Sequence, residues 1–176
     1  MKFVDCTVKD KISLEVLKER IRLSIDSETM MYIGVDSQEF GEYLNVVVVI
    51  ILHKRNKGGR LFYCREIIKS AVHRSLRYRI LYETQKVTQV ALELAELENM
   101  CKQIVVHLDI NSDEQYKSNA FMNEATAYVI AQGFDCVVKP YSWAAFSAAD
   151  RYTKRVKRSV RQNNKTTKNK EQEENR

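Results

Sequence analysis

The fold is indicated first by the stretch Met31-Tyr32-Ile33-Gly34-Val35-Asp36, a short apolar run that closes on a carboxylate. After a turn-like segment over residues 37–41, residues 43–53 are rich in β-branched side chains, which favour a strand. Residues 54–59 have the composition of a tight turn, and residues 60–65 complete an antiparallel hairpin with the strand before them. This part of the chain therefore predicts three consecutive strands.

Helices are predicted both before and after these strands in the chain. Apolar residues recur at helical spacing within residues 9–26 and again along residues 76–97. Strands and helices then alternate: a strand over 104–108 that ends at Asp109, a helix over 118–132 stopped by Gly133, a strand over 134–139 halted by Pro140, and a last helix from about 142 to about 157. The order predicts an α/β fold with a mixed sheet, antiparallel over its first three strands and parallel afterwards, flanked by helices.

Length and hydropathy bound the class of protein. The 176 residues allow one domain, which we place over residues 1–158. The longest apolar run, Val46 to Leu52, has the length of a buried strand and is too short for a membrane span. The first residues lack the apolar core of a signal peptide, so we expect a cytoplasmic protein with no membrane partner.

The basic character of the chain belongs to its last residues. Residues 151–176 carry ten Lys/Arg and three Glu, which leaves nineteen basic and twenty acidic side chains on residues 1–150, a net charge of −1. Residues 159–176 are almost entirely polar, and we expect a disordered basic tail there. The four cysteines stand far apart without C-x-x-C spacing, which predicts reduced thiols and neither a zinc site nor a disulfide framework.

Two aspartates lie at the strand ends where α/β sheets commonly bind their ligands. Asp36 follows the first predicted strand directly, and Asp109 follows the fourth in the same way. Two carboxylates on neighbouring strands repel each other unless a cation or proton lies between them, and oxygen ligands suit Mg²⁺ or Mn²⁺. Taken alone, each Asp is also a common cap of the following turn, so that alternative stays open.

The chain resembles the YkuK family, which is predicted to be ribonuclease H-like. The similarity runs from about residue 30 to residue 155, with its motifs in the family's order. These motifs are Tyr32-Ile33-Gly34-Val35-Asp36-Ser37-Gln38, His107-Leu108-Asp109-Ile110-Asn111, Gly133-Phe134, Lys139-Pro140, Trp143-Ala144-Ala145, Ala149-Asp150-Arg151 and Thr153-Lys154.

The resemblance to ribonuclease H-like proteins implies an active site of four acids. Asp36 and Asp109 fit the two strand positions, and Asp150 fits the acid of a later helix, where the small residues before it would allow a close approach to the sheet. For Asp150 a solvated helix position paired with Arg151 or Lys154 is the alternative. Glu83 is our choice for the acid of the long helix, although an exposed position paired with Arg79 is the alternative. Such a site would hold two Mg²⁺ or Mn²⁺ ions and cleave a phosphodiester.

Several other side chains are candidates for contact with nucleic acid. A basic hairpin tip and two lysines near the acids could bind phosphate, namely Lys54, Arg55, Lys57, Arg60, Lys117 and Lys154; a solvated turn is the alternative for the tip. His107 lies on the strand face of Asp109, and here we favour a hydrogen-bonded core histidine. Trp143 and Tyr141 could stack a base, but we favour core packing for both.

Three functions remain in competition. We rank first a metal-dependent nuclease or related phosphodiesterase acting on RNA or DNA. The second is a nucleic-acid-binding module without turnover, and the third is a regulatory domain that binds a protein partner. The near-neutral charge of residues 1–150 is compatible with the third.

Overall fold

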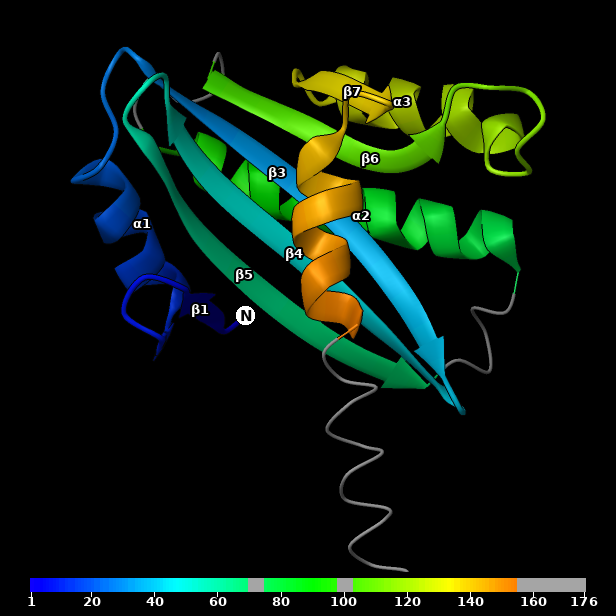
Figure 1. Cartoon of the computed structure of the whole chain (residues 1–176), viewed down its shortest axis with the longest axis horizontal. Helices are drawn as coiled ribbons and strands as arrows, with labels where there is room; N and C mark the ends of the chain where they lie inside the picture. Colours follow the sequence, from blue (N-terminus) through cyan, green and yellow to red (C-terminus); the bar gives the residue numbers. More distant parts are fainter. Residues whose placement is uncertain (70–74, 98–102, 155–176) are drawn as a thin grey trace, which may run out of the picture.

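The computed structural model describes residues 1–69, 75–97 and 103–154 of the chain. These residues form a mixed sheet in the order β2-β1-β5-β4-β3-β6-β7, with helices on both of its faces (Figure 1). In chain order the elements are β1 (Phe3–Asp5), β2 (Asp10–Ile12), α1 (Leu14–Arg22), β3 (Thr29–Phe40), β4 (Tyr43–Lys54), β5 (Gly58–Lys69), α2 (Leu76–Ala95), β6 (Ile104–Asn111), η3 (Asn119–Phe121), α3 (Met122–Ala131), β7 (Asp135–Lys139) and η4 (Ala144–Ala149).

The centre of the sheet is a long antiparallel meander. Strand β4 pairs with β3 on one side and with β5 on the other, each over its whole length. Nine consecutive residues of β4, from Leu44 to Leu52, are buried, because helices cover both faces of the sheet here. Strands β6 and β7 then add to β3 in parallel. The predicted mixed α/β sheet, antiparallel first and parallel afterwards, is confirmed.

Two predicted strand ends were wrong. Strand β3 continues through the expected turn over residues 37–41 as far as Phe40, and β6 continues past Asp109 to Asn111. Cross-strand hydrogen bonding explains the first error, since β3 stays paired with β4 up to Phe40 opposite Tyr43. The chain reverses only at Gly41, whose φ of 57° suits glycine.

The expected helix over residues 9–26 was too long at both ends. Only Leu14–Arg22 is helical, and Ser13 begins the helix by accepting a hydrogen bond from the Val16 amide. Residues 10–12 instead form β2, which pairs with β1, and β1 pairs with β5. Strands this short are stabilised by pairing with residues far away in the chain, and the local pattern of hydrophobic residues gives no sign of that pairing.

The remaining helices follow the predictions more closely. Helix α2 fills the predicted range 76–97 apart from its last residues, and α3 with η3 fills 118–132. Gly133 ends that helix with a φ of 87°, as expected of a glycine cap. The last helix spans residues 143–154, and its segment η4 is a π-helix. The expected disordered tail and Cys101 lie outside the described residues.

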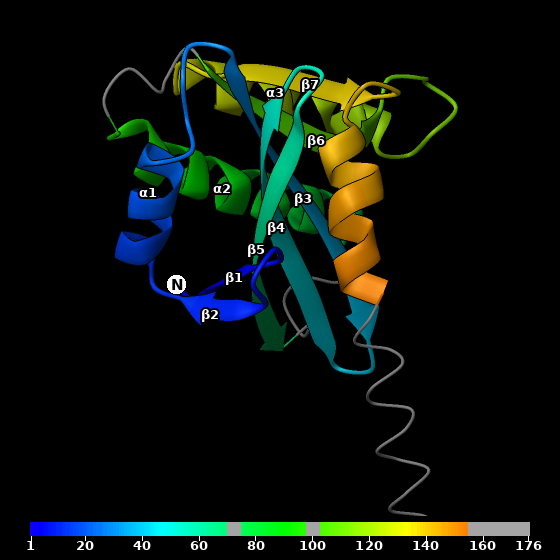
Figure 2. The same cartoon turned by 60° about the vertical axis from the view of Figure 1, so that its left-hand side comes forward.

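Helices lie on both faces of the sheet (Figure 2), and the sheet separates two hydrophobic layers. Helices α1 and α2 pack on one face, over the main core that contains Ile33, Val48 and Leu94. The last helix crosses the opposite face, where Val47, Val49 and Ile51 lie beneath it. Among the described residues no helix has both the length and the apolar composition that a membrane span needs. Of the cysteines there, Cys64 and Cys136 are free thiols, and Cys6 Sγ lies 3.2 Å from the Tyr152 hydroxyl.

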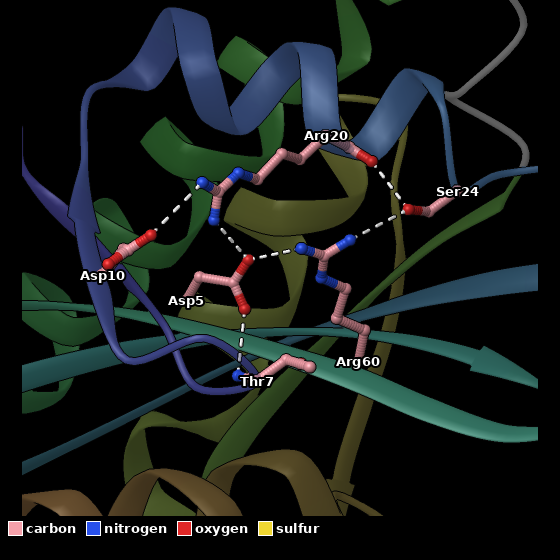
Figure 3. Close-up of polar contacts among 6 residues, drawn as sticks. All are labelled: Asp5, Thr7, Asp10, Arg20, Ser24 and Arg60. Carbon is pink, nitrogen blue, oxygen red and sulfur yellow. Dashed lines mark hydrogen bonds and ion pairs between the residues drawn. The ribbon is translucent and has the colours of Figure 1, made fainter.

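A buried ion cluster ties the first strand to the rest of the fold (Figure 3). The fully buried Asp5 carboxylate accepts hydrogen bonds from Arg20 of α1 at 2.7 Å and from Arg60 of β5 at 2.5 Å. The Thr7 amide binds its other oxygen at 3.0 Å. Burial alone would raise the pKa of Asp5, but the hydrogen bonds of the two arginines outweigh burial and lower the pKa to about 2.

Candidate active site

Asp36 and Asp109 lie side by side on the sheet face that the last helix crosses. The parallel pairing of β3 with β6 ends at Gly34 opposite His107, and each aspartate stands two residues beyond that pair. Because side chains alternate along a strand, both carboxylates point to the same face as Gly34 and His107. The two acids were expected at strand ends, but it is the end of the shared pairing between their strands that brings them together.

The last helix brings Asp150 to the same place. It approaches β3 so closely that a Cβ on Gly34 would lie 2.6 Å from the amide nitrogen of Ala145. The small residues Ala144, Ala145 and Ala149 are fully buried in this contact. The close approach expected from the small-residue run is therefore present, and Asp150 follows directly after it.

Thr153 links the helix to the strand. Its hydroxyl lies 2.6 Å from Oδ2 of Asp36 and 2.9 Å from the carbonyl oxygen of Asp150. The backbone carbonyl of Thr153 in turn accepts a hydrogen bond from the buried side chain of Asn45, at 3.0 Å. The sequence prediction gave Thr153 no role, and its only signal was its place in the motif beside Lys154.

The negative charges of Asp109 and Asp150 both act on the carboxylate of Asp36. Burial raises the pKa of Asp36 to about 6; the hydrogen bond from Thr153 opposes this rise, and the negative charges of Asp109 and Asp150 add to it. Ammonium groups compensate the other two carboxylates. Lys139 lies 2.6 Å from Asp109, and Lys154 lies 2.5 Å from Asp150.

Glu83 reaches the cluster from the opposite face of the sheet. It lies on α2 and is buried, with only 8% of its surface exposed, so the exposed position of the alternative was wrong. The pairing with Arg79 that the alternative named is present, at 3.9 Å. Ser37, the residue after Asp36, points to the α2 face and donates a hydrogen bond to Oε1 of Glu83. Burial raises the pKa of Glu83 to about 8, opposed by Ser37 and Arg79 and reinforced by Asp36 and Asp109.

The donor chemistry of these residues fits a hard divalent cation. Carboxylate oxygens are the ligands that Mg²⁺ and Mn²⁺ prefer. The pKa values of Asp36 and Glu83 are raised mainly by burial, and the negative charges of the neighbouring acids add to the rise. As the side chains stand, no three His, Cys, Asp or Glu groups within the described part of the chain are close enough to hold a metal ion.

His107 is a neutral core residue, as we favoured. It is 2% exposed, and its Nδ1 accepts a hydrogen bond from the Ala144 amide at 3.1 Å. Burial lowers its pKa to about 4. The imidazole thus holds the first turn of the last helix against the sheet.

The basic hairpin tip lies away from the acids, and most of its charge is already paired. Lys54 pairs with Asp26 and with Glu28 at 3.3 Å; Lys57 lies 3.9 Å from Glu28. Arg60 turns inward to Asp5, as Figure 3 shows. Lys54 of the tip lies opposite Thr29 of β3. Asp36 lies seven residues further along β3. That is about 23 Å along the strand, so a phosphate held at the acids cannot also touch the tip.

The remaining candidates are at the surface. Arg55 and Lys117 are exposed, and no acidic side chain of the described ranges pairs with either. Tyr141 is 76% exposed and Trp143 is 37% exposed. Core packing was therefore the wrong expectation for Tyr141, and it holds only in part for Trp143.

Comparisons with known proteins agree with this architecture. The family described as "Ribonuclease H-like" matches residues 13–154. An uncharacterized protein, YkuK of Bacillus subtilis (strain 168), is 28% identical over 155 residues, which cover 80% of this chain and 88% of that protein. No solved structure is a significant match. With the matched region containing all four acids and the whole parallel edge of the sheet, the chain belongs to the ribonuclease H-like family.

Proposed function

We propose that this protein is a metal-dependent nuclease or a related phosphodiesterase that acts on RNA or DNA in the cytoplasm. The observation that carries the proposal is the convergence of Asp36, Asp109 and Asp150 on one face of the sheet, with Glu83 approaching from the other. Carboxylates at such density are unfavourable without compensating cations, and membership of the ribonuclease H-like family adds independent support.

In this proposal Asp36, Asp109 and Asp150 hold two Mg²⁺ or Mn²⁺ ions, and Glu83 completes the acidic set. A divalent cation bound there would lower the pKa of water and screen the charge of a phosphodiester. The hydroxyl of Thr153 orients the carboxylate of Asp36, and Ser37 orients that of Glu83. These two hydroxyls keep the acids in place before any substrate arrives, which reduces the reorganisation that the reaction needs.

Lys139 and Lys154 have a second role in the same proposal. Each ammonium group lies against an acid of the cluster, at 2.6 Å and 2.5 Å. Lysine side chains are flexible, so each can turn from its carboxylate to a phosphate oxygen when a cation takes its place. The site would thus exchange two internal ion pairs for contacts with cation and substrate.

The test is cleavage of a panel of labelled RNA, DNA and hybrid substrates with Mn²⁺ or Mg²⁺. We expect cleavage by the wild-type chain, loss of cleavage with a chelator, and a loss of at least about a hundredfold in Asp109→Asn. Asp135→Asn is the matched control, because it removes an exposed carboxylate from the neighbouring strand β7. Cleavage that survives both the chelator and Asp109→Asn would refute the proposal.

A second function, binding of nucleic acid without turnover, is favoured by one observation. Two of the acids are already neutralised by lysines, and the described residues contain no ready-made metal site. This alternative predicts salt-sensitive binding that persists in Asp36→Asn, with no cleavage under any divalent cation. Removal of residues 155–176 should weaken such binding, because that segment carries most of the excess positive charge.

A further inference from the structure

Four rings from four different elements meet on the same face as the acids. Tyr32 of β3 is the centre, with ring centroids 5.0 Å from Trp143, 5.2 Å from His107 and 6.2 Å from His53. Trp143 and His107 also meet edge to face, at 5.5 Å. We call these four residues the ring cluster. Such centroid distances are those of directly packed aromatic groups.

The ring cluster is buried on the side of His107 and exposed to solvent on the side of Trp143 and His53. His107 is buried and bound to the Ala144 amide, which holds the start of the last helix in place. Trp143 is 37% exposed, and His53 is exposed as well. A flat ligand could therefore stack on the open rings without any rearrangement of the backbone, and little conformational entropy would be lost on binding.

The position of the ring cluster relates it to the proposed active site. Tyr32 precedes Asp36 by four residues on the same face of β3, a separation of about 13 Å. His53 lies two residues from Arg55, at the tip of the β4–β5 hairpin. The ring cluster thus stands between the acids and the exposed hairpin, along the line of one strand. At a rise of about 3.4 Å for each stacked nucleotide, the distance to the acids corresponds to roughly four nucleotides.

We infer that the ring cluster binds unpaired nucleobases, so that the preferred ligand of this protein is a single-stranded nucleic acid. The inference rests on the proposed function, because it assigns the substrate class of the same site. Every base offers a π face to an aromatic ring, whereas in a duplex those faces are covered by neighbouring bases. The Tyr32 and Trp143 rings at the centre of the cluster carry no charged group that would bind a phosphate, so a base is the part of the ligand that they recognise.

The chain supplies its own probe, since Trp143 is its single tryptophan. Asp109→Asn in Mg²⁺ is titrated with an oligothymidylate of about 20 nucleotides, an abasic oligomer of equal length and the matching duplex, while Trp143 fluorescence and ligand anisotropy are recorded. We expect the single strand to quench Trp143 and to bind at least tenfold more tightly than either other ligand. Equal quenching by the abasic oligomer, or equal affinity for the duplex, would overturn the inference.

Substitutions give the second arm of the test. Trp143→Leu should weaken binding of the single strand roughly ten- to a hundredfold, and Trp143→Phe should restore most of the loss because it keeps a ring. Tyr141→Leu is the matched control, a 76% exposed tyrosine in the same turn, outside the ring cluster. An equal loss in Trp143→Leu and Tyr141→Leu would contradict a specific stacking site.

Different experimental results would refute the inference and the proposed function. Quenching by single strands in a protein that cleaves nothing would refute the nuclease and leave the base-binding site standing. Cleavage by the wild-type chain, with affinity for single strands unchanged by Trp143→Leu, would leave the nuclease standing and refute the stacking site.

Discussion

The hydroxyl of Thr153 lies 2.6 Å from a carboxylate oxygen of Asp36, across 117 residues of sequence. The same hydroxyl lies 2.9 Å from the backbone carbonyl of Asp150, so one side chain links the carboxylate of Asp36 to the backbone of the helix that carries Asp150. The neighbouring pair, Ser37 and Glu83, repeats the arrangement on the other side of the sheet. Each buried acid of the candidate site is thus held by a hydroxyl.

The first prediction concerns Thr153→Val, which keeps the shape of the side chain and removes its hydroxyl. Loss of a hydrogen bond to a half-buried carboxylate should lower the free energy of unfolding by about 1–3 kcal/mol. The loss should be larger at pH 8 than at pH 5, because Thr153 stabilises the ionised form of Asp36, whose pKa is about 6. Urea unfolding at the two pH values measures it. Thr126→Val, which removes a hydroxyl bound to the Met122 carbonyl on α3, should show no such difference.

The second prediction concerns Glu83, whose pKa is raised from 4.5 to about 8. A pKa raised on folding stabilises the fold below the unfolded value, and this contribution is lost as the pH rises through 8. In the presence of a chelator, Glu83→Gln should therefore match the wild type near pH 5 and exceed its unfolding free energy by on the order of 4 kcal/mol at pH 9. An equal effect of the substitution at both pH values would contradict a buried, ionising Glu83.

The third prediction concerns Asp5, whose pKa is lowered to about 2. The pH dependence is opposite to that of Glu83. The stabilisation from Asp5 is complete above its unfolded-state pKa of 3.8 and is lost as the pH falls toward 2. At pH 7, Asp5→Asn should cost about 2–4 kcal/mol, because it leaves two arginines without their buried partner. Asp10→Asn is the control within the same cluster, since Asp10 is 60% exposed and lies 3.6 Å from Arg20. Denaturant unfolding should show a loss under about 0.5 kcal/mol for the control.

The fourth prediction concerns Gly34→Ala. The added methyl would meet the backbone of Ala144 and Ala145, neither of which can move without displacing the last helix. We expect a loss of more than about 2 kcal/mol in unfolding free energy, together with weaker Mn²⁺ binding by calorimetry as Asp150 moves away. Gly41→Ala is the comparison, because its methyl meets nothing within 4 Å and its cost comes only from a φ of 57°. If Gly34→Ala kept the full affinity for Mn²⁺, metal binding would not depend on the contact between the last helix and β3, and the prediction would be wrong.

The predictions from sequence succeeded where a local pattern carries the information. The β-branched run of β4 and the apolar period of α2 each identify an element without reference to the rest of the chain. Gly133 ended its helix as expected, because a positive φ is a local property of one residue. The mixed sheet followed from the order of these elements.

Strand ends and edge strands could not be predicted in the same way. Strand β3 stays paired with β4 as far as Phe40, and β1 is paired with β2 on one side and with the distant β5 on the other. The roles of the hairpin cations were also decided by partners distant in sequence, such as Asp5 for Arg60 and Asp26 for Lys54.

By itself, then, the sequence determined the fold class and named the four acids of the candidate site. Tertiary structure alone decided that Asp36 and Asp109 meet where two strands stop pairing, that Glu83 arrives from the opposite face, and that hydroxyls bind Asp36 and Glu83. The physical reason is one of range. Hydrophobic period and backbone preference act over a few residues, whereas the burial and charge that raise the pKa of Asp36 and Glu83 come from side chains tens of residues away.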